Sequence, residues 1–353
     1  MYECYECGNL YPADELNDVN GNDICDDCLN DDYITCDCCG DYVHTYDAIN
    51  DDDMTLCQFC YENYYYRCEG CNCIVHRDDV YYTDVYYYCQ SCYDEKEDII
   101  YNYNYTPYLE FYGDGNGFYG VEVEIDDGNN RNSTARELYD IAGRDHIYCK
   151  YDGSLTRGFE IVSHPMTLNY HMQNMPWEDV FNECMENGFK SHDTTTCGLH
   201  IHASRELFGS NSTEIDLTAA KIMLLFTKFW DSHIVNFTRR STSALRDWAR
   251  RPDEIIDAEN DDEPTILNKV GYEKRGSRYK ALNLTNRNTI EFRLFRGTLK
   301  YTTFIACLQF VDYLIHFAKK TSLKKLNDFS WQDIFKDCKY NELNNYLKKR
   351  GLM

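Results

Sequence analysis

The chain has 353 residues, of which 19 are cysteine, and carries a formal net charge of −25 at pH 7. This acidity argues against nucleic acid as a partner, because binding to phosphates needs clustered lysine and arginine side chains. No stretch approaches the roughly 20 consecutive apolar residues of a membrane helix, so we expect no membrane span.

The first part of the chain, residues 1–95, contains one cysteine pattern three times at a period of 32 residues. Each copy has two Cys-x2-Cys pairs separated by 17 residues, a spacing typical of structural zinc sites with four thiolate ligands. A disulfide framework is the alternative. It fits less well, because the sequence shows no signal peptide that would direct the chain to an oxidising compartment. We therefore predict three structural Zn2+ ions, bound by Cys4, Cys7, Cys25 and Cys28, by Cys36, Cys39, Cys57 and Cys60, and by Cys68, Cys71, Cys89 and Cys92.

Each repeat reads as a knuckle, a hairpin, a second knuckle and a short polar helix, an order that resembles a treble-clef zinc finger. A unit of 32 residues is too short to bury a core of its own, so the metal must supply much of its folding free energy. Cys38 and Cys73 lie outside the repeated pattern, and we interpret both as spare thiols.

Charge is concentrated in the repeats. Residues 1–100 contain 25 acidic side chains and only three basic ones, whereas the rest of the chain is close to neutral. The zinc-finger array should therefore repel DNA and bind a basic protein or peptide instead. The tyrosine runs at 64–66 and 86–88 could contact such a partner or pack beside the zinc sites, and the sequence leaves both interpretations open.

Composition changes after the third repeat. Residues 96–117 are predicted to be a linker, followed by a larger domain at 118–320 and a helical extension at 321–353. Segment 251–277 is rich in acidic residues. We interpret it either as a mobile cover or substrate-specific insertion, or as a disordered loop.

Within the larger domain, hydrophobic periodicity predicts strands and helices in mixed order. Strands are expected at 118–126, 158–163, 198–204, 278–284 and 288–296. Helices are expected at 134–147, 176–188, 214–238, 300–319 and 330–349, the first opened by a capping box from Thr134 to Glu137. Because strands and helices do not alternate strictly, we predict an α+β fold with a largely antiparallel sheet and flanking helices.

Acidic side chains occupy positions within predicted strands where apolar or uncharged residues are more usual. Glu122 and Glu124 alternate onto one strand face, about 7 Å apart, where they suit a divalent cation, although a solvated edge strand would look the same. Glu160 lies within an apolar strand, where an unpaired carboxylate is costly to bury and needs a cation. Together these carboxylates predict a metal site.

Histidines and arginines accompany the carboxylates. His200, His202 and Ser204 share one strand face, which favours a metal or phosphate site over a structural role. Glu291 and Arg293 also share a face. That pairing suits a metal ligand beside a phosphate clamp, with an ordinary cross-strand ion pair as the alternative.

The order of these motifs resembles the amidoligase family of the glutamine synthetase-like carboxylate–amine ligase superfamily, which includes phage-encoded members. The resemblance covers about 118–319 and rests on Gly-x-Glu-x-Glu, Asp-Gly-Ser followed by Gly-Phe-Glu-Ile-Val, Cys-Gly-Leu-His-Ile-His, and Thr-Ile-Glu-Phe-Arg-x-Phe-Arg-Gly. It implies an antiparallel sheet whose concave face binds ATP and Mg2+ (or Mn2+). The implied reaction phosphorylates a carboxylate and then lets an amine displace the phosphate. The zinc array lies outside the resemblance and looks like an added recognition module.

The resemblance also implies roles for individual residues. Arg293 would steady the transferring phosphoryl group, with Arg278 and Arg296 as further candidates for binding phosphate or the substrate carboxylate. His202 and Ser204 would line the nucleotide site together with His200. Asp152 is a possible substitute for a carboxylate ligand that has no match in this chain. The implied metal ligands are Glu122, Glu124, Glu160, His200 and Glu291.

Two other functions suit the same residue types. One is a metal-dependent phosphohydrolase or nuclease, and the other is a zinc-finger adaptor whose catalytic domain is inactive. ATP-dependent formation of an amide would distinguish a ligase from both. For the ligase we expect a protein or peptide substrate recruited by the zinc array and a small amine or amino acid as co-substrate. We also expect a cytoplasmic location, in the host cytoplasm if the chain is encoded by a phage.

Overall fold

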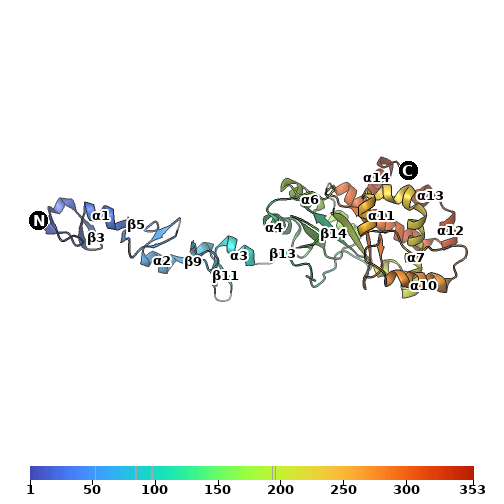
Figure 1. Ribbon diagram of the computed structural model, residues 1–353, viewed down its shortest axis with the longest axis horizontal. Coiled ribbons are helices and arrows are strands. Elements are labelled where there is room, and N and C mark those ends of the chain that lie inside the picture. The colour runs from blue at the N-terminus through green and yellow to red at the C-terminus, as the bar shows by residue number, and fades with distance from the viewer. Residues whose placement is uncertain (52, 84–85, 97–98, 193, 195) are drawn as a thin grey trace. The chain divides into compact units, whose positions relative to one another are not determined.

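The computed structural model describes residues 1–51, 53–83, 86–96, 99–192, 194 and 196–353 (Figure 1). It divides into two compact units, Met1–Asp98 and Ile99–Met353. The first unit holds the cysteine repeats and the second holds the larger domain. Among the described residues, no helix combines the length and the apolar character needed to cross a lipid bilayer.

The first unit consists of three modules with the same order of elements, two short antiparallel strand pairs and then a seven-residue helix. Each helix begins directly after the first cysteine of the second pair, so the predicted knuckle, hairpin and helix order is confirmed. The strands are β1 (Tyr2–Glu3), β2 (Leu10–Tyr11), β3 (Leu16–Val19), β4 (Asn22–Cys25), β5 (Tyr33–Thr35), β6 (Tyr42–His44), β7 (Ile49–Asn50), β8 (Thr55–Leu56), β9 (Tyr65–Arg67), β10 (Ile74–His76), β11 (Tyr81–Thr83) and β12 (Tyr86–Tyr88). The helices are α1 (Asp26–Asp32), α2 (Gln58–Tyr64) and α3 (Gln90–Lys96), with 3-10 turns η1 (Ala13–Glu15) and η2 (Arg77–Asp79).

The tyrosines of the modules divide between packed and exposed positions. Tyr88 is 1% exposed and packs inside the third module. The rings of Tyr66 and Tyr87 stack with centroids 3.8 Å apart. Tyr64 and Tyr86 are exposed and remain available for contact with a partner.

The second unit is built on a seven-stranded sheet with the strand order β13-β15-β16-β14-β17-β19-β18. β13 and β15 run parallel, and the other neighbouring pairs run antiparallel. The predicted combination of helices and strands is confirmed, with a mixed sheet. The strands are β13 (Ile100–Tyr101), β14 (Tyr119–Ile125), β15 (Ile147–Lys150), β16 (Phe159–Ser163), β17 (Gly198–Ser204), β18 (Leu282–Asn283) and β19 (Thr289–Arg296).

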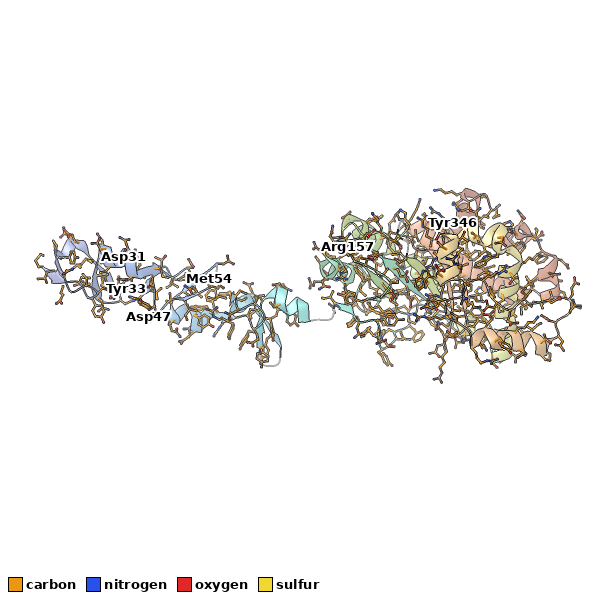
Figure 2. All side chains as sticks on the ribbon, viewed as in Figure 1. Asp31, Tyr33, Asp47, Met54, Arg157 and Tyr346 are labelled. Atoms are coloured by element: carbon orange, nitrogen blue, oxygen red, sulfur yellow. The ribbon has the colours of Figure 1, made fainter. Side chains whose placement is uncertain are left out.

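Helices supply most of the remaining core, and their side chains fill the interior of this unit (Figure 2). Tyr346, labelled in Figure 2, ties the last helix to the core by donating a hydrogen bond to the Phe237 carbonyl oxygen, 2.8 Å away. The helices are α4 (Arg131–Ala142), α5 (Leu168–Gln173), α6 (Trp177–Glu186), α7 (Ser212–Phe229), α8 (Val235–Thr238), α9 (Thr242–Trp248), α10 (Glu263–Lys274), α11 (Tyr301–Lys320), α12 (Leu323–Asp328), α13 (Trp331–Phe335) and α14 (Asn341–Lys349), with a 3-10 turn η3 (Arg205–Leu207) and a π turn η4 (Trp230–Ile234).

Alternation along the central strands β14, β17 and β19 separates an apolar face of the sheet from a polar one. The apolar face presents Val121, Leu199 and Phe292, all 0% exposed. Helices cover it, since α11 contacts β17 and Phe226 of α7 meets the ring of Phe292. Burial of one face in this way leaves the other face of the same strands to carry ionisable side chains.

The structure differs from two predictions, one of a helix cap and one of a loop. The capping box was wrong, because α4 begins at Arg131 after Asn130, which has a left-handed φ of 50°. Thr134 therefore lies inside the helix and cannot cap it. Segment 251–277, predicted as a mobile cover or loop, contains α10, and buried Ile266 and Val270 anchor that helix to the core.

The ends of the larger domain also differ from the sequence-based boundaries. The predicted linker contains β13, which pairs with β15 at the edge of the sheet. Tyr112, which is also in the predicted linker, forms an isolated β-bridge with Met166. At the other end, α12, α13 and α14 bury Leu326, Trp331 and Leu347 in the same core as the sheet. The second unit is thus larger than the segment 118–320.

Gly158 provides a test of how tightly the start of β16 is packed against the end of β14. A Cβ atom at this position would lie 1.8 Å from the Ile125 carbonyl oxygen, which belongs to the backbone and cannot move freely. We expect Gly158→Ala to destabilise the second unit by at least about 1–3 kcal/mol, measured by thermal or denaturant unfolding. Gly153→Ala is the matched control, because no atom lies within 4 Å of its Cβ position. Equal stability of the two variants would contradict this packing.

Candidate active site

Strand register brings the ionisable side chains of β14, β17 and β19 together on the polar face. Glu122 lies opposite His200, and His202 lies opposite Glu291. On the other side of β14, Glu124 lies opposite Glu160 of β16. Residues that are far apart in sequence therefore become neighbours across antiparallel strands.

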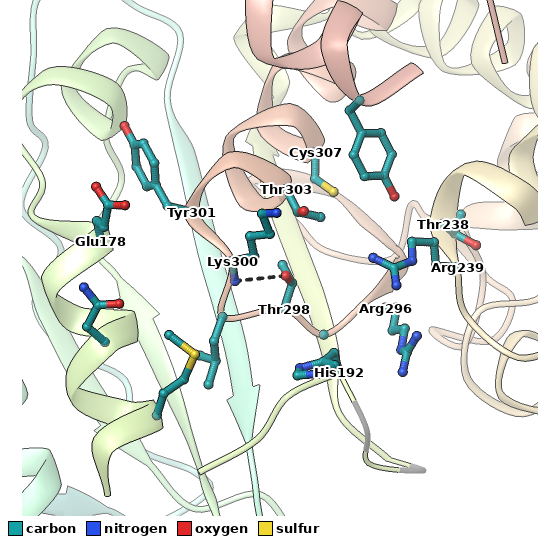
Figure 3. A pocket seen from close by; sticks show the side chains of 15 residues that line it. Glu178, His192, Thr238, Arg239, Arg296, Thr298, Lys300, Tyr301, Thr303 and Cys307 are labelled. Atoms are coloured by element: carbon teal, nitrogen blue, oxygen red, sulfur yellow. Dashed lines mark hydrogen bonds between the residues drawn. The ribbon is translucent and has the colours of Figure 1, made fainter. Parts of the chain in front are cut away.

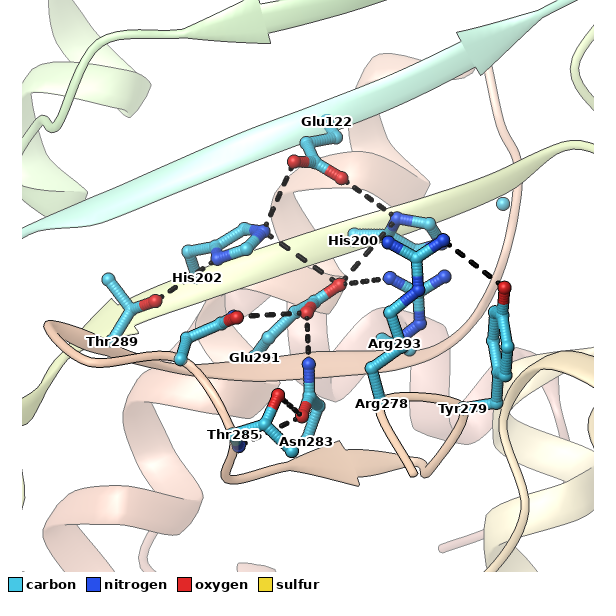
Figure 4. Close-up of polar contacts among 12 residues, drawn as sticks. Glu122, His200, His202, Arg278, Tyr279, Asn283, Thr285, Thr289, Glu291 and Arg293 are labelled. Carbon is cyan, nitrogen blue, oxygen red and sulfur yellow. Dashed lines mark hydrogen bonds and ion pairs between the residues drawn. The ribbon is translucent and has the colours of Figure 1, made fainter. Parts of the chain in front are cut away.

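The centre of this cluster is a group of two carboxylates and two imidazoles (Figure 4). His200 Nδ1 is 3.0 Å from Glu122 Oε2, and His202 Nε2 is 3.3 Å from Glu122 Oε1. Both histidines are also 3.8 Å from Glu291 Oε1. Burial opposes ionisation of Glu122, but the nearby His202 and His200 hold its pKa well below the usual range.

Glu291 is held in place through both of its oxygens. Arg293 Nη1 donates to Oε1 at 2.5 Å. Asn283 and Asn286 donate to Oε2 at 2.7 and 3.2 Å. Glu291 itself is 3% exposed, so these donors compensate for its loss of water. The arrangement fixes the carboxylate and aims it at the two histidines (Figure 4).

Glu124 and Glu160 form the outer part of the cluster. Glu124 Oε2 accepts a hydrogen bond of 2.5 Å from the Gly198 amide. Glu160 Oε2 is 3.3 Å from Lys150 Nζ. Burial together with the charges of Glu122 and Glu124 raises the pKa of Glu160 to about 9. Burial likewise raises the pKa of Glu124. The site thus concentrates more negative charge than its own side chains neutralise, which favours a bound cation.

Three of these groups are close enough to bind one ion. The ligand atoms of Glu122, His202 and Glu291 all lie within 4.8 Å of one another. His202 Nε2 is buried and faces carboxylate oxygens of Glu122 and Glu291, 3.3 and 3.8 Å away, so a cation bound between these atoms would have three ligands. The two carboxylates are the oxygen ligands that Mg2+ and Mn2+ prefer, and the imidazole adds a nitrogen ligand that is more usual for transition-metal ions.

This group differs from the ligand set that the sequence resemblance implied. Glu122 and Glu291 belong to both sets. His202, expected in the nucleotide site, takes the place of His200 next to them. Glu124 and Glu160 lie outside the group, although both line the same cavity.

Comparison of the sequence with known protein families identifies the domain that contains these residues. The family model described as "Putative amidoligase enzyme" matches residues 120–315, more than half of the chain. The chain belongs to the amidoligase family. The matched region includes the whole cluster on β14, β16, β17 and β19, and it excludes the cysteine repeats. Family membership indicates a ligase. No curated protein matches the chain.

The cluster of the amidoligase domain lies between two cavities. It lines a polar space of about 160 Å³. His200, Arg278 and Arg293 line this space and also a cavity of about 500 Å³ that includes Arg240. On the other side, Glu122 and His202 border a cavity of about 570 Å³. That cavity is mainly apolar and is lined by Leu109, Phe111, Phe118, Val162 and Ser204.

The remaining expected residues are divided between the amidoligase site and another cavity. Arg278 donates to the hydroxyls of Tyr103 and Tyr279 at the rim of the site. Asp152 also lines it. Arg296 does not, because it lies in a separate cavity of about 440 Å³ with Arg239, Lys300 and Glu178 (Figure 3). Arg296, the last residue of β19, therefore lies outside the cluster.

Three residues of the amidoligase site were missed in the sequence. Lys150 comes just before Asp152 and could have been noticed from that motif. Tyr103 lies in the segment predicted to be a linker. Arg240 Nη1 donates to the Arg293 carbonyl oxygen at 2.8 Å, and no local pattern marks it. Only the fold brings these residues to the site.

The cysteine repeats form three thiol groups within reach of a metal. The Sγ atoms of Cys7 and Cys25, and of Cys39 and Cys57, are 3.9 Å apart. A tetrahedral zinc site with 2.3 Å bonds needs about 3.8 Å between sulfurs, so both distances fit. The groups are Cys4, Cys7, Cys25 and Cys28; Cys36, Cys39, Cys57 and Cys60; and Cys68, Cys71, Cys73 and Cys89. The first two are the predicted sets. In the third, Cys73 is not a distant spare thiol but a member, in place of Cys92.

Proposed function

We propose that this amidoligase is an ATP- and Mg2+-dependent carboxylate–amine ligase that forms an amide or isopeptide bond. The observation that carries the proposal is the group of Glu122, His202 and Glu291 beside Arg293, placed between two cavities that can each hold a reactant. The amidoligase model covers all four residues.

The chain's own residues divide the work at this centre. Glu122, His202 and Glu291 would hold a divalent cation, which supplies Lewis-acid neutralisation of the triphosphate. Arg293 stands next to Glu291 and its side chain is only 13% exposed, so its guanidinium can face the transferring phosphoryl group with little competition from bulk water. Asn283 and Asn286 keep the Glu291 carboxylate in position.

The proposed reaction has two steps. A carboxylate oxygen attacks the γ-phosphorus of ATP, and ADP leaves, which gives an acyl phosphate. An amine that has lost a proton then attacks the acyl carbon, and phosphate leaves as the amide forms. The sum is acid, amine and ATP giving amide, ADP and phosphate. Glu124 lines the same cavity and would accept the amine proton, whereas Glu160, whose pKa is raised to about 9, already holds a proton near pH 7.

The two cavities suggest where the reactants bind. The cavity with Arg240, Arg278 and Arg293 suits the carboxylate substrate, because guanidinium groups pair with carboxylates. The apolar cavity with Phe111 and Phe118 suits the adenine base. Phe111→Ala should therefore raise the KM for ATP more than the KM for the acid, and the reverse pattern would contradict this assignment.

The position of Lys150 predicts how many divalent cations the catalytic centre binds. Its ammonium lies 3.3 Å from Glu160, where a second divalent ion would otherwise find a ligand. We therefore expect one Mn2+ per catalytic centre in the native protein and two in Lys150→Met. Mn2+ titration of the zinc-loaded chain, followed by electron paramagnetic resonance, measures this number. Lys190→Met, with an exposed lysine outside the cavity, is the control. Two ions in the native protein would contradict the role of Lys150.

For the zinc-finger array we propose recruitment of a basic protein or peptide substrate. The support is the balance of 25 acids and three bases in residues 1–100. Binding of an arginine-rich probe peptide to the full chain should weaken steeply between low and high salt, whereas salt-independent binding or preferential binding of DNA would contradict the proposal.

We propose a cytoplasmic location because the cysteines form no disulfide bonds in the structure. All 19 cysteines are free in the structure, a state that a reducing compartment preserves. Intact-mass measurement of protein taken from cells should show no disulfide, and a disulfide-linked chain would contradict this location.

The decisive experiment measures ADP release from ATP and Mg2+ by the purified, zinc-loaded chain. Pools of amino acids, peptides and cell extract are added as sources of acid and amine. Stimulated ADP release together with a new amide product would support the ligase. Release of phosphate from simple phosphoesters without amide formation would indicate a hydrolase instead, and absence of both turnover and ATP binding would indicate an adaptor.

A further inference from the structure

The third zinc-finger module has one more thiol at its metal site than the first. Cys73 lies within 4.8 Å of Cys68, Cys71 and Cys89, and its Sγ is 3.3 Å from that of Cys71. Cys92, the ligand expected from the repeat, nevertheless contacts the thiols of Cys68, Cys71 and Cys89. Five thiols therefore surround one site.

Two substitutions within the repeat account for this crowding. The position of Cys73 is Asn9 in the first module and Asp41 in the second, so only the third module has a thiol there. The position of Gly70 is Glu6 in the first module and Cys38 in the second. A Cβ atom at Gly70 would lie 2.6 Å from the Cys92 Sγ, which no side chain tolerates.

Gly70 and Cys73 together explain why the third module has five thiols at its metal site. The glycine leaves room for the Cys92 thiol against the first knuckle, and the extra cysteine places a second thiol next to Cys71. In the second module the thiol group consists of the four repeated cysteines and does not include Cys38. The spare thiol there is not in an equivalent position.

We propose that the third module is a five-thiol zinc site in which Cys73 and Cys92 are interchangeable fourth ligands. Zinc in structural sites binds four thiolates and has no electronic preference for one geometry, so a fifth thiolate next to the metal can enter as another leaves. Both thiols are partly exposed, so whichever is not bound can be reached by solvent. This proposal is independent of the catalytic function.

Zinc counting in the intact chain by native mass spectrometry tests the exchange. The unaltered chain should bind three zinc ions. Cys28→Ala is the matched control, because the first module has only four cysteines, and it should bind two. Cys73→Ala and Cys92→Ala should each retain three, and the double variant should retain two. A loss of zinc in either single variant would overturn the interchange.

A second measurement does not depend on the folding of any variant. The unaltered chain is labelled with N-ethylmaleimide, and the labelled cysteines are mapped while three zinc ions remain bound. Partial labelling at both Cys73 and Cys92, with none at Cys25 and Cys28, is the expected result. Labelling confined to one of Cys73 and Cys92 would show a fixed ligand set and would overturn the proposal.

Discussion

Replacing Glu291 by Gln should abolish ATP-dependent turnover while leaving the fold intact. Glutamine nearly preserves the shape of the side chain, so the core around it is not emptied. It removes the negative charge, however, and it presents an NH2 group to either Arg293 or Asn283, both of which are donors. We expect a loss of at least about 10²–10³-fold in kcat, because the carboxylate can no longer hold a cation.

Arg293→Ala should cause a comparable loss for a different reason. It removes the guanidinium that faces the phosphoryl group and takes away the hydrogen-bond donor of the buried Glu291 Oε1. Glu178→Gln is a suitable control, because Glu178 lines the separate cavity that contains Arg296. Initial rates of ADP release and thermal unfolding curves should be measured for all three variants. Full activity of Glu291→Gln or Arg293→Ala would exclude this cluster as the active site.

The polar face of the sheet could be predicted from the sequence because strand alternation is a local property. Glu122 and Glu124, His200 and His202, and Glu291 and Arg293 each share a face by their spacing of two. Strand alternation therefore indicated which side chains could meet.

The pairing across strands could not be predicted in the same way. It depends on register, and β17 and β19 shift register between Leu199 and Ile201. This register places His202 opposite Glu291 and leaves His200 opposite Glu122. No spacing within one strand contains that information, so the grouping of His202 with Glu122 and Glu291 emerged only from the fold.

Residues contributed by irregular segments were the hardest to foresee. Tyr103 follows the short edge strand β13 and reaches Arg278, a residue 175 positions away in sequence. Arg240 comes just after α8 and is oriented by the Arg293 carbonyl oxygen. Neither residue belongs to a periodic pattern, because its position is set by tertiary contacts and not by the local secondary structure.

Removal of zinc should unfold residues 1–98 and leave the second unit folded. The apolar cluster of the first module consists of Val19, Ile24 and Leu29. That of the second consists of Cys36, Leu56 and Cys60, joined by Ile74 of the third module. Such small cores do not offset the conformational entropy of ordering each module. Structural zinc contributes about 10–16 kcal/mol per site in comparable modules, so the metal decides whether they fold.

Hydrogen exchange after chelation measures this dependence region by region. Amides of α1 and α2 should lose their protection, because the amides of Cys25 and Cys57 that donate to the sulfurs of Cys4 and Cys36 are fixed only while those sulfurs bind metal. Amides of β14 and β17 should keep theirs, since an extensive apolar core of helices and sheet holds them without zinc. Protection that persists in α1 and α2 after all zinc has been removed would show that the modules fold without metal, and the thiols would then need a different explanation.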